Sequence, residues 1–448
     1  MIQRLGERLT RIAQRWLPDP FILALLLVLV AALLAWLVKG ASLPQVVGYL
    51  RPSKEGFWGL NILEFSMQMC LVLIGGQAIA SSPPVRAALG RLGRLPLGTG
   101  PAAALVSFCA MSSALINWGL GLLVGAYLAR ELAIASKRAG RRLHYPLLGA
   151  AGYGGLMIWH GGLSGSAPLD VASWKEKAVP LAETIGLPMN LVLNGVLLAV
   201  VPVLFWMMAP KREEDVIEAS FPEAAPPPAE AQTPVQRIEN SWLWTLVFGA
   251  AAAWIVREGV RAEGWKYFNL YTVTFLFLFV GWILHGSAMS FARAVYDGAS
   301  SCGGIILQFP FYATIAAMIS GTGLQDSIQR WTESAARGCT AIGMSEQVAF
   351  CALTFIAACI LNVFVPSGGG QWKVQGPVVL AAAAGVGVPA GKAVMMVAYG
   401  DELTNMIQPF WALALLGVTG LGARQIMGYT TAVMLIVFPI YLACICLL

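Results

Sequence analysis

The stretch Asn362-Val-Phe-Val-Pro-Ser-Gly-Gly-Gly-Gln-Trp372 interrupts an otherwise apolar segment, 348–385. Its proline and three consecutive glycines break a helix, whereas the apolar residues on both sides favour one. Backbone without helical hydrogen bonds is tolerated at bilayer depth only inside protein or beside a wet cavity, because unpaired peptide groups are costly in hydrocarbon. The stretch therefore predicts a re-entrant hairpin, 348–385, with a binding site at its unwound tip. The alternative is a glycine-rich surface loop.

The composition predicts an all-α polytopic membrane protein. Of the 448 residues, 58% are hydrophobic and 12% are charged, and the mean hydropathy is +0.70. Seven of the eight cysteines lie in apolar spans, and the three histidines form no metal-binding motif. We therefore expect no disulfide framework, metal, cofactor or nucleic-acid partner. We expect the lipid bilayer to surround the chain, and the sequence leaves open whether the protein forms a homo-oligomer.

Basic residues set the predicted orientation. Residues 1–19 are expected to form an interfacial amphipathic helix with four arginines on one face, followed by an uncleaved apolar span at 21–38. Lysine and arginine concentrate on the cytoplasmic side of membrane proteins. The N-terminus and the basic loops at 86–94 and 130–142 are therefore predicted to be cytoplasmic.

Between those basic loops lies a first hairpin. Segment 96–128 is too short for two crossings of about 20 residues each and has the wrong parity for one. We predict that it enters from the cytoplasmic side and turns back. Its polar interruption, Met111-Ser-Ser-Ala-Leu-Ile-Asn117-Trp-Gly-Leu-Gly121, supplies Asn117, Trp118 and Gly119 as candidate binding residues.

Two parts of the chain match in nearly one register. Aligning Asn117 with Asn362 places Tyr153 opposite Tyr399, at separations of 36 and 37 residues. The match predicts two structural repeats, each with spanning helices around a hairpin and a broken helix. The chain would cross the membrane about nine times in addition to the two hairpins.

The segments between the repeats fix their relative orientation. The first repeat is predicted at 20–208 and the second at 267–448. An acidic, proline-rich linker, 209–241, is expected to be cytoplasmic and disordered. A connecting helix and loop, 242–266, then carry the chain outward, so the second repeat is inverted and the C-terminus is extracytoplasmic.

Four motifs resemble the bacterial short-chain fatty acid transporters: Arg-Trp-Leu-Pro-Asp-Pro20, Ile116-Asn-Trp-Gly119, Val365-Pro-Ser-Gly-Gly-Gly370 and Gln408-Pro-Phe-Trp-Ala-Leu413. The similarity extends over nearly the whole chain outside the linker. It implies movement of small monocarboxylates such as acetate, butyrate or acetoacetate across the bacterial inner membrane. The hairpin architecture is more distantly similar to ion-coupled dicarboxylate transporters. Their Ser-Asn-Thr signatures are missing here, so their ion ligands are not carried over.

An anionic substrate would be held by neutral donors and helix N-termini. No lysine or arginine lies in the hairpin segments 96–129 and 347–372 or in the broken helices 146–169 and 393–423. The expected substrate-binding residues are Asn117, Trp118, Gly119, His160, Asn362, Ser367, Gly368, Gly369, Gly370, Gln371, Trp372, Thr404, Asn405 and Gln408.

Several of these residues have a structural alternative. An Asn or Ser away from the tips also joins helices by hydrogen bonds, and His160 could relay protons or be a structural histidine. Aromatic side chains beside the polar groups could wall an alkyl tail, or could simply pack. They are Trp118, Trp159, Trp372, Phe410 and Trp411.

Asp401 and Glu402 are adjacent acids in the second broken helix and are the candidate ion-coupling residues. A bare carboxylate in a span costs about 2.5–3.5 kcal/mol, so a proton or a sodium ion must neutralise it. Adjacent helical positions point about 100° apart. We therefore expect Asp401 to face the site and Glu402 a water-filled vestibule or a loop end, unless both lie at a solvated mouth.

A proton is favoured as the coupling ion because a monocarboxylate carrying one proton crosses without net charge. The alternative coupling ion is sodium, bound by Asp401, Thr404 and carbonyl groups of the nearby unwound backbone. The hairpins and broken helices favour a secondary transporter with alternating access at paired tips. A membrane enzyme is an alternative, with His160, Ser164 and Ser166 as the nearest catalytic set, but no orienting acid lies nearby in the sequence. A passive channel is the third class.

Overall fold

The computed structural model describes residues 20–54, 56–174, 176–219, 233–364, 367–408 and 411–448. These residues form helices and no strand, which confirms the all-α class. The interfacial helix expected at 1–19 lies outside the described residues.

The helices before the linker build two apolar spans, a hairpin, a broken helix and a further span. In chain order they are α2 (Pro20–Lys39), α3 (Leu43–Gly48), α4 (Leu60–Ser81), α5 (Pro83–Gly93), α6 (Thr99–Ala114), α7 (Trp118–Arg138), α8 (Tyr145–Tyr153), η1 (Gly154–Met157), η2 (Trp159–Gly161), α9 (Ser166–Ala172), η3 (Leu181–Glu183) and α10 (Pro188–Met207). Helices α6 and α7 form the hairpin. The helix that starts as α8 loses its regular winding in η1 and η2 and resumes as α9.

The remaining elements begin inside the linker with two short helices and continue with a peripheral helix, two apolar helices, a hairpin, a broken helix and a last apolar helix. They are η4 (Glu213–Asp215), α11 (Pro234–Glu239), α12 (Trp242–Glu263), η5 (Gly264–Tyr267), α13 (Leu270–His285), α14 (Ala288–Ala299), η6 (Ser300–Cys302), α15 (Gly303–Gly321), α16 (Leu324–Gly338), η7 (Cys339–Ile342), α17 (Glu346–Phe364), α18 (Gly368–Val386), α19 (Ala390–Thr404), η8 (Asn405–Ile407), α20 (Leu413–Thr419) and α21 (Ala423–Leu447). Helices α17 and α18 form the second hairpin, and α19, η8 and α20 the second broken helix.

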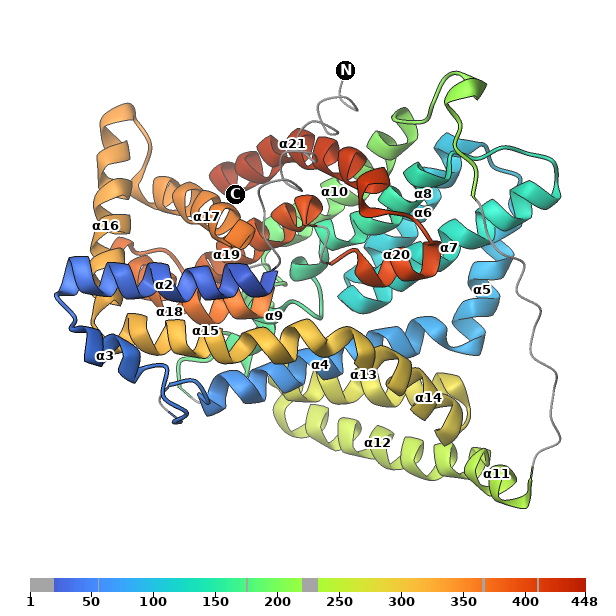
Figure 1. Ribbon diagram of the computed structural model, residues 1–448, viewed down its shortest axis with the longest axis horizontal. Helices are drawn as coiled ribbons and strands as arrows, with labels where there is room; N and C mark the ends of the chain where they lie inside the picture. Colours follow the sequence, from blue (N-terminus) through green and yellow to red (C-terminus); the bar gives the residue numbers. More distant parts are fainter. Residues whose placement is uncertain (1–19, 55, 175, 220–232, 365–366, 409–410) are drawn as a thin grey trace.

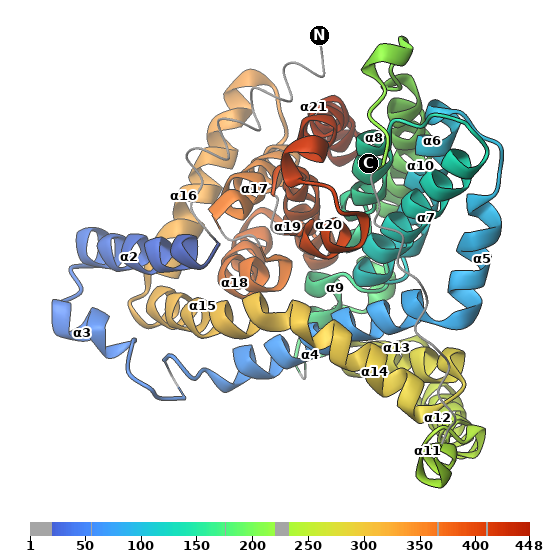
Figure 2. The same ribbon diagram turned by 45° about the vertical axis from the view of Figure 1, so that its right-hand side comes forward.

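Each half of the chain packs its long helices against the other half. Helix α2 lies against α15, α13 lies against α4, and α10 lies against α21. Figure 1 shows α2, α4, α13 and α15 running along the long axis, with α16 at one end and α5 at the other. Figure 2, turned by 45°, shows the second hairpin and α19 beside α21, with the first hairpin and α10 beyond it. The two halves therefore share one core.

The helices are apolar enough for a membrane. Seven helical stretches of the described chain are long and apolar enough to cross a bilayer, and Ala24–Lys39 and Leu270–His285 are shorter apolar helices. Helix α12 exposes large apolar side chains, among them Trp244, Phe248 and Trp254, which suit a lipid environment. The architecture is thus that of a polytopic membrane protein. The number of crossings stays a prediction.

The first part of the linker is ordered. The Ile217 N–H donates to His144 Nδ1 over 3.1 Å, and the Tyr145 N–H donates to the Ile217 carbonyl over 2.8 Å. Arg142 and Glu218 form an ion pair of 2.6 Å. The expectation of a disordered linker is wrong for residues 213–218, because the side chains of Arg142 and His144 and the backbone N–H of Tyr145 offer them partners.

Two tyrosines that the sequence alignment paired each reach across to the other half. The Tyr153 hydroxyl donates to the carbonyls of Asn405 and Gln408 over 2.8 and 2.7 Å. The Tyr399 hydroxyl donates to Asn190 Oδ1 over 3.1 Å, and the Asn190 amide in turn donates to the Gly161 carbonyl over 2.9 Å. Each break is therefore held by a tyrosine of the opposite half.

Candidate functional site

The join between α17 and α18 lies within the stretch from Asn362 to Trp372, on which the prediction of a hairpin rested. Helix α18 begins after Ser367, whose Oγ accepts a hydrogen bond of 3.2 Å from the Gly370 N–H and caps the helix. A helix leaves its first N–H groups without intrahelical partners, so Gly368 and Gly369 present N–H donors at this end. The tip therefore carries the positive end of a helix of 19 residues.

The glycine run at this tip is required by close packing on three different neighbours. A Cβ on Gly368 would lie 2.7 Å from the His160 ring, one on Gly369 would lie 2.3 Å from Phe65, and one on Gly370 would lie 2.6 Å from Tyr312. Such distances leave no room for a methyl group. The glycines thus bring the backbone of α18 against side chains from both halves.

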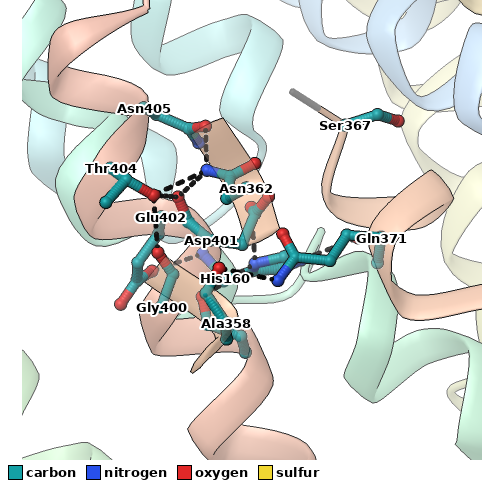
Figure 3. A network of polar contacts seen from close by, with 12 residues as sticks. His160, Ala358, Asn362, Ser367, Gln371, Gly400, Asp401, Glu402, Thr404 and Asn405 are labelled. Carbon is teal, nitrogen blue, oxygen red and sulfur yellow. Dashed lines mark hydrogen bonds and ion pairs between the residues drawn. The ribbon is translucent and has the colours of Figure 1, made fainter. Parts of the chain in front are cut away.

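Asn362 ties the end of α17 to the second break. Its Nδ2 lies 2.7 Å from the Asp401 carbonyl, 2.8 Å from Thr404 Oγ1 and 3.2 Å from Asn405 Oδ1. The Gln408 side chain returns a hydrogen bond of 2.8 Å to the Asn362 carbonyl. Figure 3 shows this amide pointing into the turn between α19 and η8. The two unwound segments of the second half therefore form one network.

His160 and Asp401 meet at the centre of the molecule. Both side chains are about 1% exposed, and His160 Nδ1 lies 3.1 Å from Asp401 Oδ2 (Figure 3). The same nitrogen lies 3.1 Å from the Ala398 carbonyl, which accepts only, so Nδ1 carries a hydrogen. The approach to Asp401 lacks the direction of a hydrogen bond. Neither Asp401 carboxyl oxygen receives one from the described residues.

The other edge of the His160 ring reaches a serine. His160 Nε2 lies 2.7 Å from Ser166 Oγ, at the start of α9. The Trp159 ring stacks on the imidazole with centroids 3.8 Å apart. A hydroxyl, an imidazole and a carboxyl group are thus in contact in that order.

Glu402 is buried, although the sequence placed it at a wet vestibule or a loop end. Its side chain is 0% exposed. Its Oε2 accepts a hydrogen bond of 2.8 Å from the His160 N–H, and its Oε1 accepts one of 3.0 Å from the Tyr441 hydroxyl. The expectation is wrong because η2 and α21 supply two donors for this carboxyl group. The alternative of two acids at a solvated mouth is also excluded, since Asp401 is 0% exposed.

A small cavity lies between the two hairpin tips. Its volume is ≈ 20 Å³, room for about one water molecule. Both halves line it, through Met69, Trp118, Leu156, Trp159, Ser166, Ile305, Phe309, Ser367, Gly368, Gly369, Asn405 and Trp411. One wall is aromatic, because the Trp118 ring centroid lies 6.0 Å from that of Trp159 and 5.4 Å from that of Trp411.

The structure brings part of the predicted set to this cavity. Trp118, Ser367, Gly368, Gly369 and Asn405 line it. A polar layer adjoins it, made by His160, Asn362, Asp401, Glu402, Thr404 and Gln408.

The remaining predicted residues point elsewhere. Asn117 donates to the Val72 carbonyl over 2.9 Å, and Gly119 packs on Leu73. Gln371 donates to the Ala358 carbonyl over 3.0 Å and to Gln375 over 2.9 Å. Gly370 packs on Tyr312, Trp372 is hydrogen-bonded to Asp170, and Phe410 lies outside the described residues.

Sequence reasoning missed a charged pair beside the second tip. Lys373 Nζ lies 2.7 Å from Asp170 Oδ1, and the Trp372 indole N–H donates to Asp170 Oδ2 over 2.9 Å. The hairpin segment without basic residues ends at residue 372, and Lys373 follows it directly. The lysine itself was visible in the sequence, but its partner lies 203 residues away.

The whole chain, residues 1–448, matches the family described as short chain fatty acid transporter. A protein of Escherichia coli K12 provisionally named a short-chain fatty acid transporter is 36% identical over 450 residues, covering 97% of both chains. A protein of Haemophilus influenzae with the same provisional name is 34% identical over 462 residues, covering 99% of both chains.

Two solved structures share the fold. The YdaH transporter of Alcanivorax borkumensis has a TM-score of 0.62 at 15% identity, covering 96% of this chain and 98% of that one. MtrF of Neisseria gonorrhoeae, described as illuminating a class of antimetabolite efflux pumps, has a TM-score of 0.59 at 14% identity, covering 98% and 97%. At these identities the likeness establishes the fold alone.

Proposed function

The chain belongs to the short-chain fatty acid transporter family, and we propose that it is a secondary carrier of small monocarboxylates such as acetate, butyrate and acetoacetate across the bacterial inner membrane. Family membership makes it a membrane transporter and not an enzyme. The proposal covers the substrates, the coupling ion and the route through the protein.

The observation that carries the proposal is the cavity between the hairpin tips. On one side it meets Ser367, Gly368 and Gly369 at the N-terminus of α18, where N–H donors and the helix dipole favour a carboxylate. On another side it meets Trp118 and Trp159, which offer an apolar wall to a short alkyl tail. A small amphipathic anion matches both surfaces.

We propose alternating access between two inverted repeats. The order of helices from α2 to α10 recurs from α13 to α21, and residues of both halves line the cavity. A cavity of ≈ 20 Å³ holds no butyrate molecule, so substrate binding requires the two tips to separate. Rocking one repeat against the other would open the cavity to each side in turn.

We propose Asp401 as the proton-coupling carboxyl group. It is fully buried, touches His160 and lacks hydrogen-bond donors among the described residues, so a proton is the simplest means of neutralising it. Ser166 lines the cavity and contacts His160, which connects the substrate carboxyl group to Asp401. One proton carried with one monocarboxylate leaves no net charge to move.

Sodium is the second candidate, and one observation favours it. Asn362 Oδ1 and Gln408 Oε1 are buried acceptors without donors in the described part of the chain, as are both Asp401 oxygens. Oxygen atoms of this kind are ligands for hard cations. The ring of His160 favours the proton, because its protonated Nδ1 lies 3.1 Å from Asp401 Oδ2 and leaves little room for a cation on that oxygen.

Counterflow of labelled butyrate in proteoliposomes tests the function. Vesicles loaded with unlabelled butyrate should accumulate the label transiently, because a carrier exchanges internal for external substrate whereas a channel only equilibrates it. The label should be recovered as unchanged butyrate. An imposed pH gradient should drive net accumulation and an imposed sodium gradient should not. No counterflow would reject the function, and accumulation driven by sodium alone would reject the proton.

A further inference from the structure

A second and larger cavity opens at the end of the molecule opposite α5. Its volume is ≈ 450 Å³. It lies beside the first residues of α4, whereas α5 follows the other end of α4 (Figure 1). Among the described residues that line it, two are lysines, Lys54 and Lys373, and none is acidic. The charged side chains that line it are therefore both lysines, of which Lys373 is paired with Asp170.

Lys373 lies at the inner end of this cavity, where its ammonium group contacts Asp170. The Nζ–Oδ1 distance is 2.7 Å, and the side chains are 16% and 6% exposed. Asp170 does not depend on the lysine alone, because its Oδ2 also accepts hydrogen bonds from the indoles of Trp372 and Trp174 over 2.9 and 3.2 Å. The carboxylate stays paired when the lysine turns toward another anion.

The ammonium group has donors to spare. A lysine carries three N–H donors, and one of them meets Asp170. The group also lies 4.6 Å from the centroid of the Phe65 ring, which attracts a cation but uses no N–H directly. Lys373 can therefore donate to a second carboxylate from the cavity without releasing Asp170.

Phe65 contacts Lys373, which lines this cavity, and Gly369, which lines the cavity between the hairpin tips. One face of its ring lies beneath Lys373, and its Cε1 atom lies against Gly369 of the inner cavity. The ring centroid is 6.1 Å from that of Phe309, which lines the inner cavity. Phe65 thus connects a lining residue of the outer cavity with a lining residue of the inner one.

We propose that the larger cavity is an outer binding site for the same small monocarboxylates, in which Lys373 holds the carboxylate before Phe65 and the start of α18 move aside. The inference rests on the proposed function and adds a second site to it. The volume lies within the range of about 300–1,000 Å³ typical of small-molecule sites. The alanines Ala313, Ala316 and Ala317 line the cavity and leave space for the alkyl tail.

Direction-dependent kinetics test this site. In vesicles of defined orientation, Lys373→Gln should raise KM about tenfold for butyrate presented on the Lys373 face, because it removes a charge-assisted hydrogen bond. KM from the opposite face should not change. Lys373→Arg should stay near wild type, since it keeps the charge. Lys392→Gln, which changes a half-buried lysine outside the cavity, is the matched control.

A labelling experiment separates binding from a purely structural pair. Asn61 is exposed and lines the cavity, so Asn61→Cys should react with a membrane-impermeant thiol reagent, and butyrate should slow the reaction. The protection should vanish when Lys373→Gln is added. A KM equal to wild type from both faces, or no protection by butyrate while counterflow is normal, would overturn the outer site. Absence of counterflow in the wild type would instead reject the proposed function.

Discussion

The two hairpin tips place an asparagine at the same position and use it differently. Asn117 caps the second helix of its own hairpin, because its Oδ1 accepts from the Leu120 N–H over 3.0 Å, and its Nδ2 donates to the Val72 carbonyl of α4. Gly76 of α4 packs so closely on this asparagine that a Cβ at Gly76 would collide with its Oδ1. Asn362 leaves the capping of α18 to Ser367 and contacts α19 and η8 instead.

The different contacts of the two asparagines give the two hairpin tips different roles. The asparagine of the first tip is fixed against α4, whereas that of the second tip is bonded to the break that holds Asp401. The first tip meets its own break through other groups, because the Trp118 N–H donates to Ser164 Oγ over 2.9 Å and the Leu163 N–H donates to the Leu115 carbonyl over 2.7 Å. The first half contributes to the chemistry through His160, which reaches Asp401 from its own broken helix. We infer that the first tip supplies a wall and that the second couples substrate binding to the ion.

Removing the Asp401 charge should have the largest effect. We expect Asp401→Asn to lower uptake driven by a pH gradient about 100-fold, which is a usual contribution of a positioned proton-transfer group. Exchange of butyrate without a gradient should persist, because the tips and the aromatic wall remain. Asp326→Asn, at an exposed position of α16, is the control. Undiminished accumulation in the Asp401 variant would exclude this residue from coupling.

Substituting each tip asparagine with alanine separates the two roles. Asn117→Ala removes a helix cap and leaves the buried Val72 carbonyl without its donor, so we expect a loss of about 1–3 kcal/mol in the free energy of unfolding. Asn362→Ala should lower uptake per folded molecule about tenfold, because the break around Asp401 loses its anchor. Uptake and thermal melting on the same purified samples measure both. Equal effects of the two substitutions on uptake and on thermal stability would contradict the different roles of the two tips.

A smaller effect concerns the first part of the linker, whose residues 216–218 bind beside the base of the first hairpin. The Ile217 N–H donates to His144 Nδ1, so docking requires a neutral imidazole, and burial lowers the pKa of His144 although Asp215 opposes the shift. The undocked state has the ordinary pKa of about 6.5 and binds more protons, so docking weakens as pH falls through that value.

Hydrogen exchange checks this pH dependence. The Ile217 amide should lose protection between about pH 7.5 and pH 5.5, after correction for the intrinsic exchange rate. The change should vanish in His144→Gln, which cannot titrate. Protection that stays constant with pH in the wild type would show that the imidazole does not control docking.

The sequence predicted where the apolar helices are interrupted, because glycine, proline and polar residues lie at those positions. The stretch from Asn362 to Trp372 does form a tip, and the polar break around His160 does separate α8 from α9. Local pattern could not show which way each side chain points. Asn117 and Asn362 occupy matching positions, yet only the contacts of α4 and α19 distinguish them.

Partners distant in the chain were beyond local reasoning. Glu402 is buried because Tyr441 and the His160 N–H come to it from two other elements. Asp170 and Lys373 meet only after α9 packs on α18. An isolated charge in a span is costly, so each of these acids implied some partner, but sequence spacing does not identify it.

Butyrate counterflow in a Gly369→Val variant tests most directly the claim that substrate passes between the hairpin tips. Valine at this position would run into Phe65 and cover the N-terminus of α18, whereas Gly195→Val, in open space on α10, is the matched control. Both proteins must elute as folded species with similar melting temperatures. We predict that counterflow is lost in Gly369→Val and retained in Gly195→Val. Counterflow with wild-type affinity and rate in the folded Gly369 variant would contradict the account.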